Sequence, residues 1–421
     1  MASWTVVPIP SRWLAGPVLL SRPDGSLVSD VTLTYNPYDY AMHEDPYPTY
    51  ARLREKAPIY RNDEFDFWAL TRHADVYAAG RDYATYSNRY GVNLELWSED
   101  LAKRQSFIAM DPPEHTQFRR LVSAGFTPRR VAELEPRIRR ITHDYLDVVL
   151  DAGGEFDFIT DLAQNIPADV ISELVGVPTA DRTQILAWSN ESLLRDPVTG
   201  AVTAASVDAT RKLVGYYREL IADRRAHLGD DMVSALIEAE IDGQRLSDQD
   251  IGAVLLLLGV AGNESTTKIL GNAWYKAACH PRQRSIAFQT GRIEDWVEET
   301  LRHSSSGQMT ARHVARDVEW HGVTVPAGAR LLLIVAAANR DPRVFDRPDV
   351  FDLDRDHSKA LAFGTGPHFC LGASLARLET RVVLDELVVA VHENYAVGTP
   401  VRVHHPNIHG LSSLPTAVKA R

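Results

Sequence analysis

Cys370 is the residue whose type and surroundings point most directly to chemistry. It lies where a glycine-rich loop, residues 361–372, gives way to a helical pattern of apolar side chains that runs from about Leu371 toward Val389. Backbone N–H groups at the start of a helix lack intrahelical partners, and together with the helix dipole they favour thiolate over thiol. A thiolate is the form of cysteine that binds a metal ion. The alternative is a buried, inert cysteine, which is the commoner role of a lone cysteine, so the neighbouring residues must decide between the two.

Fixed spacings of glycine, histidine and phenylalanine surround this cysteine. The stretch LAFGTGPHFCLGASLARL contains the pattern Phe363-Gly364-x-Gly366-x-His368-x-Cys370-x-Gly372. The pattern strongly resembles the haem-thiolate loop of the cytochrome P-450 family, in which the cysteine is the proximal iron ligand, the phenylalanine packs beside it and the histidine contacts a haem propionate. The resemblance implies that the chain binds haem b (iron protoporphyrin IX), with Cys370 as the metal ligand. The further cofactor-binding residues that it implies in this loop are Phe363, His368 and Gly372.

A second segment carries cationic side chains after the prolines at positions 112 and 113. A helix that begins there places His115 and Arg119 four residues apart and therefore on one face. Cations on one face suit an anionic partner, although a solvated helix surface is the commoner explanation. The segment DPPEHTQFRR resembles the C-helix of the family, whose histidine and arginine bind the haem propionates. The resemblance also implies a third propionate partner, Arg312.

The segment Ser247–Cys279 predicts a long buried helix with a polar interruption. Ser247 and Asp250 resemble a capping box with aspartate in place of the usual glutamate, and apolar residues follow on nearly every side of the helix. The interruption, AGNESTT at residues 261–267, places a glycine, a carboxylate and three hydroxyls where they are costly. Such hydroxyls can bond the carbonyl one turn back, bend the helix and form a polar relay beside a cavity. The alternative is a helix that surfaces at Asn263.

The same interruption resembles the central helix of the family, in which an acid and an alcohol lie over the haem at the oxygen-binding face. The resemblance implies catalytic roles for Glu264 as the acid, Ser265 as the alcohol in the position usually held by threonine, and Thr266 beside it. Serine keeps the hydroxyl but lacks the methyl group that restricts χ1 of threonine. Val260 and Ala261 on the same helix are expected to line the substrate pocket.

Glu299 and Arg302 lie three residues apart in a helix predicted at Ile293–His303. As an exposed pair they would contribute only roughly 0.2–0.5 kcal/mol. The pair falls where the family has a buried ion pair joined by an arginine from a later loop, and the resemblance assigns that structural role to Arg355. After this helix the family commonly has a proline, whereas the chain has serines followed by Gly307, which predicts extra room in the substrate pocket.

The remaining patterns predict the elements that position these residues. They are a β-hairpin at residues 59–70, a nearly continuous run of helices at 128–225, and strands at 308–314, 318–320, 331–336, 401–403 and 412–417. Residues 1–40 are rich in proline, serine and glycine and are expected to be irregular. Although 421 residues suggest two or three domains by length, the resemblance implies a single domain at 41–421. The predicted fold class is mainly α with a smaller β-rich part (α+β), the cytochrome P-450 fold with a long central helix over the haem.

Composition limits which partners the protein can bind and which cellular compartment it suits. The chain is 45% hydrophobic and carries a net charge of −11, which argues against a nucleic-acid binder. Its two cysteines lie far apart and suit a reducing compartment. The N-terminus lacks a signal-peptide pattern, and no apolar run in the sequence reaches membrane length. We therefore expect a soluble, cytoplasmic, monomeric protein without a membrane anchor.

Together these segments resemble the soluble bacterial type of the family over most of the chain. The implied activity is that of a monooxygenase that inserts one oxygen atom from O₂ into an apolar small molecule, with electrons from a small ferredoxin and ferredoxin reductase. The thiolate would donate electron density that favours O–O cleavage, and the acid–alcohol pair would deliver protons. Two alternatives stay open. One is a haem-thiolate enzyme that uses peroxide directly or performs a rearrangement, and the other is a haem-thiolate ligand-binding or sensor protein without turnover.

Overall fold

The computed structural model describes residues 33–95, 97–99, 103–194, 196, 201–241, 243–392 and 395–421. The chain divides into two units, Met1–Tyr35 and Asn36–Arg421, and the fold below is that of the second unit. Most of the N-terminal segment predicted to be irregular, residues 1–32, lies outside the described residues. The last residue of that segment, Tyr40, begins the first helix, α1 (Tyr40–Glu44).

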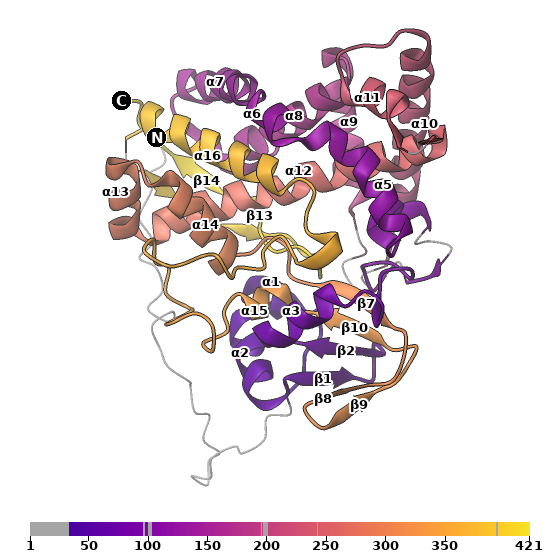
Figure 1. The fold of residues 1–421 in the computed structure, drawn as a ribbon. Coiled ribbons are helices and arrows are strands. Elements are labelled where there is room, and N and C mark those ends of the chain that lie inside the picture. The colour runs from indigo at the N-terminus through magenta and orange to yellow at the C-terminus, as the bar shows by residue number, and fades with distance from the viewer. Residues whose placement is uncertain are drawn as a thin grey trace. The chain divides into compact units, whose positions relative to one another are not determined.

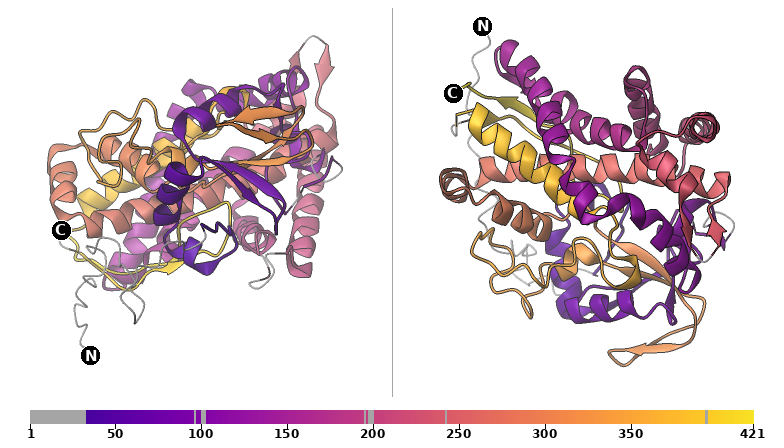
Figure 2. Two further views of the ribbon diagram at one scale, coloured as in Figure 1. Left: turned by 90° about the horizontal axis from the view of Figure 1, so that it is seen from below. Right: turned by 45° about the horizontal axis from the view of Figure 1, so that its top comes forward.

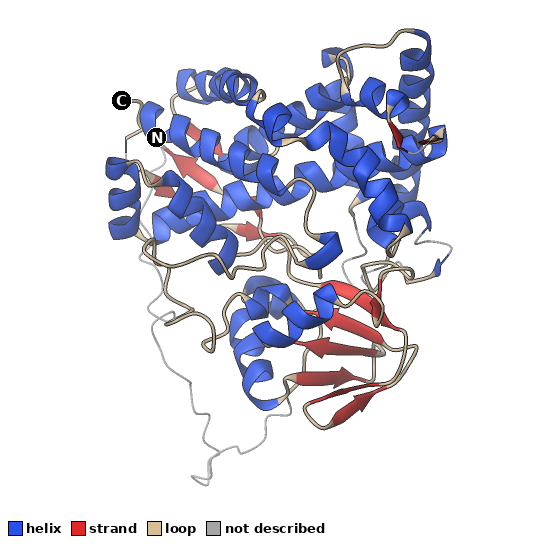
Figure 3. Cartoon of the chain, viewed as in Figure 1, coloured by secondary structure: helices blue, strands red, loops and turns tan. Residues whose placement is uncertain are grey.

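The β-rich part is built around a mixed sheet with the strand order β1-β2-β10-β7-β3. The predicted hairpin supplies β1 and β2, which pair antiparallel with Ile59 opposite Leu70. Strand β10 runs parallel to β2 and antiparallel to β7, so the sheet joins the N-terminal hairpin to residues near 310–333, as predicted (Figure 3). The strands of this sheet are β1 (Ile59–Asn62), β2 (Phe67–Leu70), β3 (Tyr86–Ser87), β7 (Thr310–Val314) and β10 (Arg330–Leu333).

Shorter strands form smaller ribbons outside this sheet. Strand β14, near the C-terminus, pairs antiparallel with both β4 and β11, which ties the C-terminal segment to the middle of the chain. The other ribbons are the pairs β5–β6, β8–β9 and β12–β13. These strands are β4 (Glu155–Asp157), β5 (Glu240–Ile241), β6 (Gln244–Arg245), β8 (Val318–Trp320), β9 (Val323–Val325), β11 (Ala396–Val397), β12 (Val401–Arg402), β13 (Leu411–Ser413) and β14 (Pro415–Ala417).

Helices form the larger part of the second unit (Figure 1). The α-helices after α1 are α2 (Tyr47–Lys56), α3 (His73–Arg81), α5 (Glu114–Ser123), α6 (Pro128–Ala132), α7 (Glu135–Asp151), α8 (Asn165–Val175), α9 (Thr179–Ser192), α10 (Ala204–Ala226), α11 (Met232–Glu238), α12 (Asp248–Cys279), α13 (Pro281–Thr290), α14 (Ile293–His303), α15 (Val335–Ala338) and α16 (Ala373–Ala390). Short 3₁₀-helices are η2 (Lys103–Ala109), η3 (Ala124–Phe126) and η5 (Gly366–His368), and η4 (Phe158–Ala163) is a short π-helix.

Helix α12 belongs to two hydrophobic cores. Its first half, with Val254 and Leu255, packs in a core formed with α8, α10 and α11. Its second half, with Leu270 and Trp274, packs in a core formed with α7, α14 and α16, and Figures 1 and 2 show α16 lying beside it. The predicted capping box starts the helix at Ser247. The polar stretch 261–267 lies where one core ends and the other begins.

Three of the predicted elements differ from the observed ones. The strand predicted at residues 412–417 is divided at Leu414 into β13 and β14, which pair with different strands. The strand predicted at residues 331–336 ends at Leu333, and α15 follows it. Residues 336–338 are alanines, which favour helix most strongly of all residues, and a short apolar run does not distinguish a strand from a buried helix. The run predicted to be helical at 128–225 also contains β4, which forms because β14 supplies a pairing partner from far along the chain.

Helix α12 is also the one helix among the described residues that could cross a membrane by length and composition. Of its most apolar 18-residue window, 56% is buried inside the protein. The central helix of a soluble protein passes the same test, so this observation is weak evidence for a membrane span.

Candidate active site

The Cys370 loop is held in shape by its backbone and by two glycines. The N–H of Cys370 donates to the carbonyl oxygen of Phe363 at 2.9 Å. Gly364 and Gly366 have φ angles of 72° and 71°, in the left-handed region where a side chain is strained. A Cβ on Gly366 would also lie 2.6 Å from the carbonyl oxygen of Gly80. These constraints present Cys370, which is exposed, shortly before the start of α16.

Opposing effects act on the Cys370 thiol. It is open to solvent on one side, but protein surrounds the sulfur elsewhere, and this burial raises its pKa. The backbone N–H of Gly372 and the guanidinium groups of Arg119 and Arg377 act in the opposite direction, and burial is the larger effect. The backbone N–H of Gly372 therefore favours the thiolate, as expected, but it does not outweigh the burial of the sulfur. A metal cation would have to replace the thiol proton.

Side chains that can donate to an anion gather beside this loop. The rings of His115 on α5 and His368 in η5 lie 4.2 Å apart between their centroids. Both ring nitrogens of His115 and Nε2 of His368 are buried without a hydrogen-bond partner. Arg312 on β7 is 5% exposed, and it donates to Thr310 Oγ1 and to the carbonyl oxygen of Ala311. Within the described residues Arg312 forms no ion pair with a carboxylate.

The electrostatics of this group indicate that an anion belongs there. Burial, and then Arg312, His115 and Arg119, lower the pKa of His368 to about 2. Burial and Arg119 lower the pKa of His115 to about 4. Burial lowers the pKa of Arg312 to about 10. Because a nearby negative charge would raise all of these values, two carboxylates such as the haem propionates would stabilise the cluster.

Arg119 connects the two histidines with the cysteine loop. It lies one turn after His115 on α5, on the predicted shared face. Its Nη1 donates to the carbonyl oxygen of Pro367 at 3.1 Å, and its Nη2 donates to that of Phe369. In this structure Arg119 therefore supports the loop, and its charge acts on His115 and His368 as well.

Uncovered apolar surface lies in the cysteine loop and in the middle of α12. Phe369, beside Cys370, is 44% exposed. Ala261 is exposed although it lies in the middle of α12, and a Cβ on Gly372 would meet no atom within 4 Å. A thiol, unpartnered donors and uncovered apolar surface are what iron, propionates and an apolar macrocycle require. The residues present therefore fit a haem group.

The predicted acid and alcohol lie on the uncovered face of α12. Ser265 Oγ donates to the carbonyl oxygen of Ala261 at 2.7 Å, one turn back, as such hydroxyls can. The helix nevertheless stays continuous from Asp248 to Cys279. Glu264 forms an ion pair with Lys268, with 3.0 Å between Oε1 and Nζ. Glu264 and Ser265 are only half-buried, in contrast to the residues that follow them.

Asn263 and Thr266 lie on the buried face of the same helix. They are 2% and 3% exposed, so the alternative of a helix that surfaces at Asn263 is wrong. Thr267 Oγ1 donates to the carbonyl oxygen of Asn263 at 2.9 Å. Of the three residues predicted to be catalytic, the structure brings Glu264 and Ser265 to the uncovered face and leaves Thr266 behind it.

The segment after α14 leaves space at Gly307, as its sequence predicts. Gly307 is exposed, and a Cβ built on it would meet no atom within 4 Å. Its backbone pairs with Ile408 in an isolated β-bridge. Ile408 had no motif to single it out, because the bridge joins two segments far apart in the sequence. Of the other expected pocket residues, Val260 is half-buried on α12.

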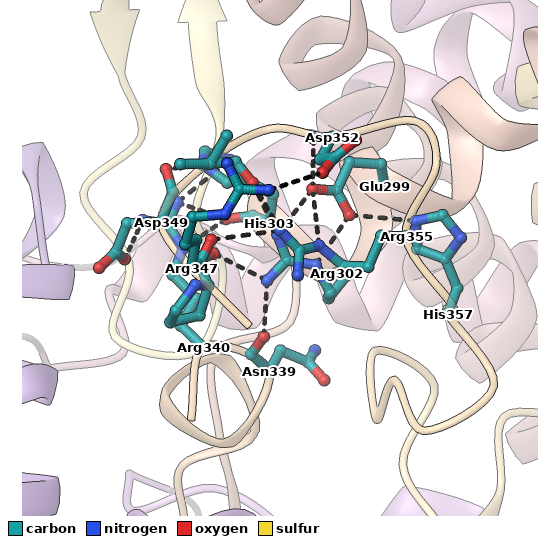
Figure 4. Close-up of polar contacts among 12 residues, drawn as sticks. Glu299, Arg302, His303, Asn339, Arg340, Arg347, Asp349, Asp352, Arg355 and His357 are labelled. Carbon is teal, nitrogen blue, oxygen red and sulfur yellow. Dashed lines mark hydrogen bonds and ion pairs between the residues drawn. The ribbon is translucent and has the colours of Figure 1, made fainter. Parts of the chain in front are cut away.

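The predicted structural pair forms the centre of a buried polar network (Figure 4). Arg302 Nη2 lies 2.7 Å from Glu299 Oε1, and Arg302 Nε lies 2.8 Å from Glu299 Oε2. Arg355 Nε lies 3.4 Å from the same carboxylate, so the structure brings the three predicted residues together. The backbone N–H of Asp352 donates to Glu299 Oε1 at 2.9 Å.

Further members of this network had no local signal in the sequence. Arg302 Nη1 donates to the carbonyl oxygen of Asn339, and Arg340 Nε donates to that of His303, both at 2.9 Å. His357 contacts Glu299 directly. Each of these contacts joins segments that are remote in sequence, so spacing alone could not reveal them.

Comparisons with known proteins agree with this geometry. A family model described as Cytochrome P450 matches residues 293–401. The putative cytochrome P450 123 of Mycobacterium tuberculosis is 47% identical over 400 residues, which cover 94% of this chain and 99% of that protein. The vitamin D(3) 25-hydroxylase of Pseudonocardia autotrophica is 37% identical over 406 residues, with 94% and 99% covered.

A solved structure confirms the predicted fold. The cytochrome P450 CYP109Q5 from Chondromyces apiculatus superposes with a TM-score of 0.83 at 32% sequence identity, covering 91% of this chain and 98% of that one. Identity of this extent along nearly the whole chain is shared with proteins named as cytochromes P450 and as a hydroxylase. The chain therefore belongs to the cytochrome P450 family, and it is a monooxygenase with haem iron as its cofactor.

Proposed function

We propose that this enzyme hydroxylates or epoxidises an apolar organic substrate with one oxygen atom from O₂, and that a small ferredoxin and ferredoxin reductase supply the electrons. The observation that carries the proposal is the presence of a carboxyl and a hydroxyl, neither of them fully buried, at consecutive positions in the middle of α12. Ser265 Oγ is bonded to the carbonyl oxygen of Ala261, and Glu264 precedes it in the chain. Such a pair can hold and move protons, and a protein that merely binds haem does not need one.

Each part of the site has a role in this proposal. Haem, when bound, supplies the activation of O₂. Cys370 would hold the iron through Sγ, and the carboxyl of Glu264 and the hydroxyl of Ser265 would pass protons from water toward the oxygen-binding face. The buried network around Glu299 holds the segment between Asn339 and His357 against α14. The residues that would hold the propionates are His115, Arg119, Arg312 and His368.

The proposed substrate is apolar. Val260 and Ala261 present apolar surface on the uncovered face of α12, and Gly307 leaves room near the end of α14. Sites lined in this way select apolar ligands. Because a similar protein is named vitamin D(3) 25-hydroxylase, sterol-like polycyclic molecules are the first class to test, followed by fatty acids and terpenoids.

Two measurements test the proposal. First, a panel of apolar ligands is screened for displacement of iron-bound water, which is seen as a spin-state shift. Second, ligands that shift the spectrum are incubated with the holoenzyme, NADPH, a ferredoxin, its reductase and ¹⁸O₂. The expected result is a product that carries one ¹⁸O atom. NADPH consumption without an oxidised product for any binding ligand would contradict the proposal.

A peroxide-using enzyme is the second candidate, and Ser265 in place of the usual threonine favours it. The same incubation is repeated with hydrogen peroxide in place of ferredoxin, reductase and NADPH. Faster product formation with peroxide would support this candidate over the first. The retained Glu264 and the Ser265–Ala261 hydrogen bond favour the ferredoxin-dependent reaction.

We further propose that the protein is cytoplasmic and monomeric, and that residues 41–421 form one domain. Its bacterial relatives of similar length support a soluble protein. Cell fractionation, light scattering and limited proteolysis test the three statements. Recovery in the membrane fraction, a dimer mass, or cleavage into two stable folded fragments would each contradict one of them.

A further inference from the structure

Glu264 has a partner outside the acid–alcohol motif, Lys268, which lies about one helical turn further along α12. The pair has the order glutamate, then lysine four residues later, which is the favourable order on a helix. The Lys268 and Glu264 side chains are 6% and 16% exposed, so the ion pair is largely removed from water. Within the described residues Glu264 is the one carboxylate that pairs with Lys268. Because a buried ammonium group needs an anionic partner, Lys268 fixes the place of the Glu264 carboxylate.

The C-terminal segment holds Lys268 in this position. A Cβ on Gly410 would lie 2.6, 2.7 and 2.8 Å from Cβ, Cγ and Cδ of Lys268. The backbone at Gly410 therefore covers the lysine stem so closely that a larger residue does not fit without movement. One further turn along α12, Asn272 Nδ2 donates to the carbonyl oxygens of Ser304 at 3.0 Å and His409 at 3.2 Å. The bond to His409 fastens the segment that contains Gly410 to α12.

From this geometry we infer that Lys268 is a positioning residue for proton delivery. Its ammonium group holds the carboxylate of Glu264, the residue before Ser265, in one place, and the backbone at Gly410 holds the lysine. The inference rests on the proposed function, because it takes Glu264 as the group that accepts a proton from water and passes it on. An ion pair that served stability alone would change unfolding but not the fate of the electrons.

Matched variants separate these two roles. Lys268→Met keeps the stem and removes the charge, Lys268→Arg keeps the charge, and Gly410→Ala displaces the lysine from outside the helix. The control Lys212→Met removes an exposed ion pair of the same spacing on α10, where Nζ lies 2.9 Å from Asp208 Oδ2. The control Gly215→Ala adds a methyl group that meets no atom within 4 Å.

Each holoenzyme is measured for the coupled fraction, the share of NADPH electrons that reach product, and for the solvent isotope effect on product formation. We expect Lys268→Met and Gly410→Ala to lower the coupled fraction about tenfold and to raise the isotope effect, since general acid–base groups contribute about 10²–10⁴-fold. Lys268→Arg and both controls stay within about twofold of the parent. The inference would be overturned if the coupled fraction of Lys268→Met stayed within about twofold of the parent. It would also be overturned if Lys268→Arg or the controls lost as much of the coupled fraction as Lys268→Met.

Crystal structures of the ferric holoproteins give a readout that does not need turnover. In Lys268→Met and Gly410→Ala the Glu264 carboxylate moves from its place in the parent protein, and in both controls it stays. A carboxylate that does not move in Lys268→Met would refute the inference. If the parent enzyme made no product from any ligand, the proposed function would fail, while this structural comparison would still decide the role of Lys268.

Discussion

His357 Nε2 lies 3.0 Å from Glu299 Oε2, although 58 positions separate the two residues in the chain. The same carboxylate also accepts two hydrogen bonds from Arg302, and both members of that pair are 0% exposed. Although burial alone would raise the pKa of Glu299, its bonds with Arg302 and His357 lower it below the ordinary value. This carboxylate therefore fastens the segment after α15 to α14.

Replacing Glu299 with glutamine is expected to lower the free energy of unfolding by about 3–5 kcal/mol, because Arg302 is left as a buried charge without its partner. The matched control is Asp295→Asn, which breaks an exposed pair with Arg292 of the same spacing near the start of α14. That change should cost less than about 1 kcal/mol. Urea denaturation at pH 7, followed by circular dichroism, measures both. Equal losses in the two variants would contradict the expectation.

The contribution of Glu299 should also depend on pH. Its pKa in the folded protein lies below the ordinary value of 4.5, so the folded state releases the proton more readily than the unfolded state. The stabilisation is therefore fully present above pH 4.5 and is lost as pH falls through the lower folded-state pKa. The difference in free energy of unfolding between the parent and Glu299→Gln should become smaller below pH 4.5. A difference that stays constant there would contradict this expectation.

Replacing Cys370 with alanine should abolish the thiolate signature in the absorption spectrum of the reduced, CO-bound haem. The reason is that Sγ of Cys370, an exposed residue of the loop, is the proposed iron ligand. Cys279→Ala is the matched control, because Cys279 is the other cysteine of the chain and lies at the far end of α12. If the signature survived in Cys370→Ala, or vanished in Cys279→Ala, Cys370 would not be the ligand.

Replacing Ser265 with alanine should divert electrons from product to hydrogen peroxide and lower the coupled fraction by at least about tenfold. Ser265→Thr keeps a hydroxyl at this position and should keep the coupled fraction of the parent. Thr266→Val is the control, because Thr266 lies on the buried face of α12 and the proposed relay uses the hydroxyl of Ser265 and not that of Thr266. Peroxide and product are quantified per NADPH consumed. Unchanged coupling in Ser265→Ala with a loss in Thr266→Val would exchange the roles of the two residues.

Glu379 on α16 provides a second pH dependence, with the opposite sign. One of its oxygens is buried without a hydrogen-bond partner, and burial raises the pKa of its carboxyl group well above 4.5. The folded protein therefore keeps a proton that the unfolded chain has already lost, so stability declines as pH rises above 4.5. Glu379→Gln has no such proton to lose.

The free energy of unfolding of Glu379→Gln, relative to the parent, should therefore rise by up to about 1.4 kcal/mol for each pH unit above the unfolded-state pKa, until the folded-state pKa is reached. Denaturation at pH 5 and at pH 8 measures this. The control is Glu294→Gln, whose side chain is 83% exposed and should show no such trend. A difference between Glu379→Gln and the parent that is the same at both pH values would show that Glu379 is not held in its protonated form.

The sequence by itself determined the local groupings. Residues three or four positions apart share a helix face whatever surrounds the helix, so spacing alone was enough to pair Glu299 with Arg302 and His115 with Arg119. The glycine spacing around Cys370 likewise describes one continuous loop. Local motifs of the same kind supported the fold class through the family that they resemble.

Only the tertiary structure decided burial and distant partners. The alanines after Leu333 form α15 instead of a longer strand. Thr266 is buried, whereas its neighbour Ser265 is only partly buried. His357 reached Glu299, and Gly410 covered Lys268, across long stretches of chain. The physical reason is that the desolvation of a group depends on every segment packed around it. The residue spacing within one segment therefore cannot predict how deeply that group is buried.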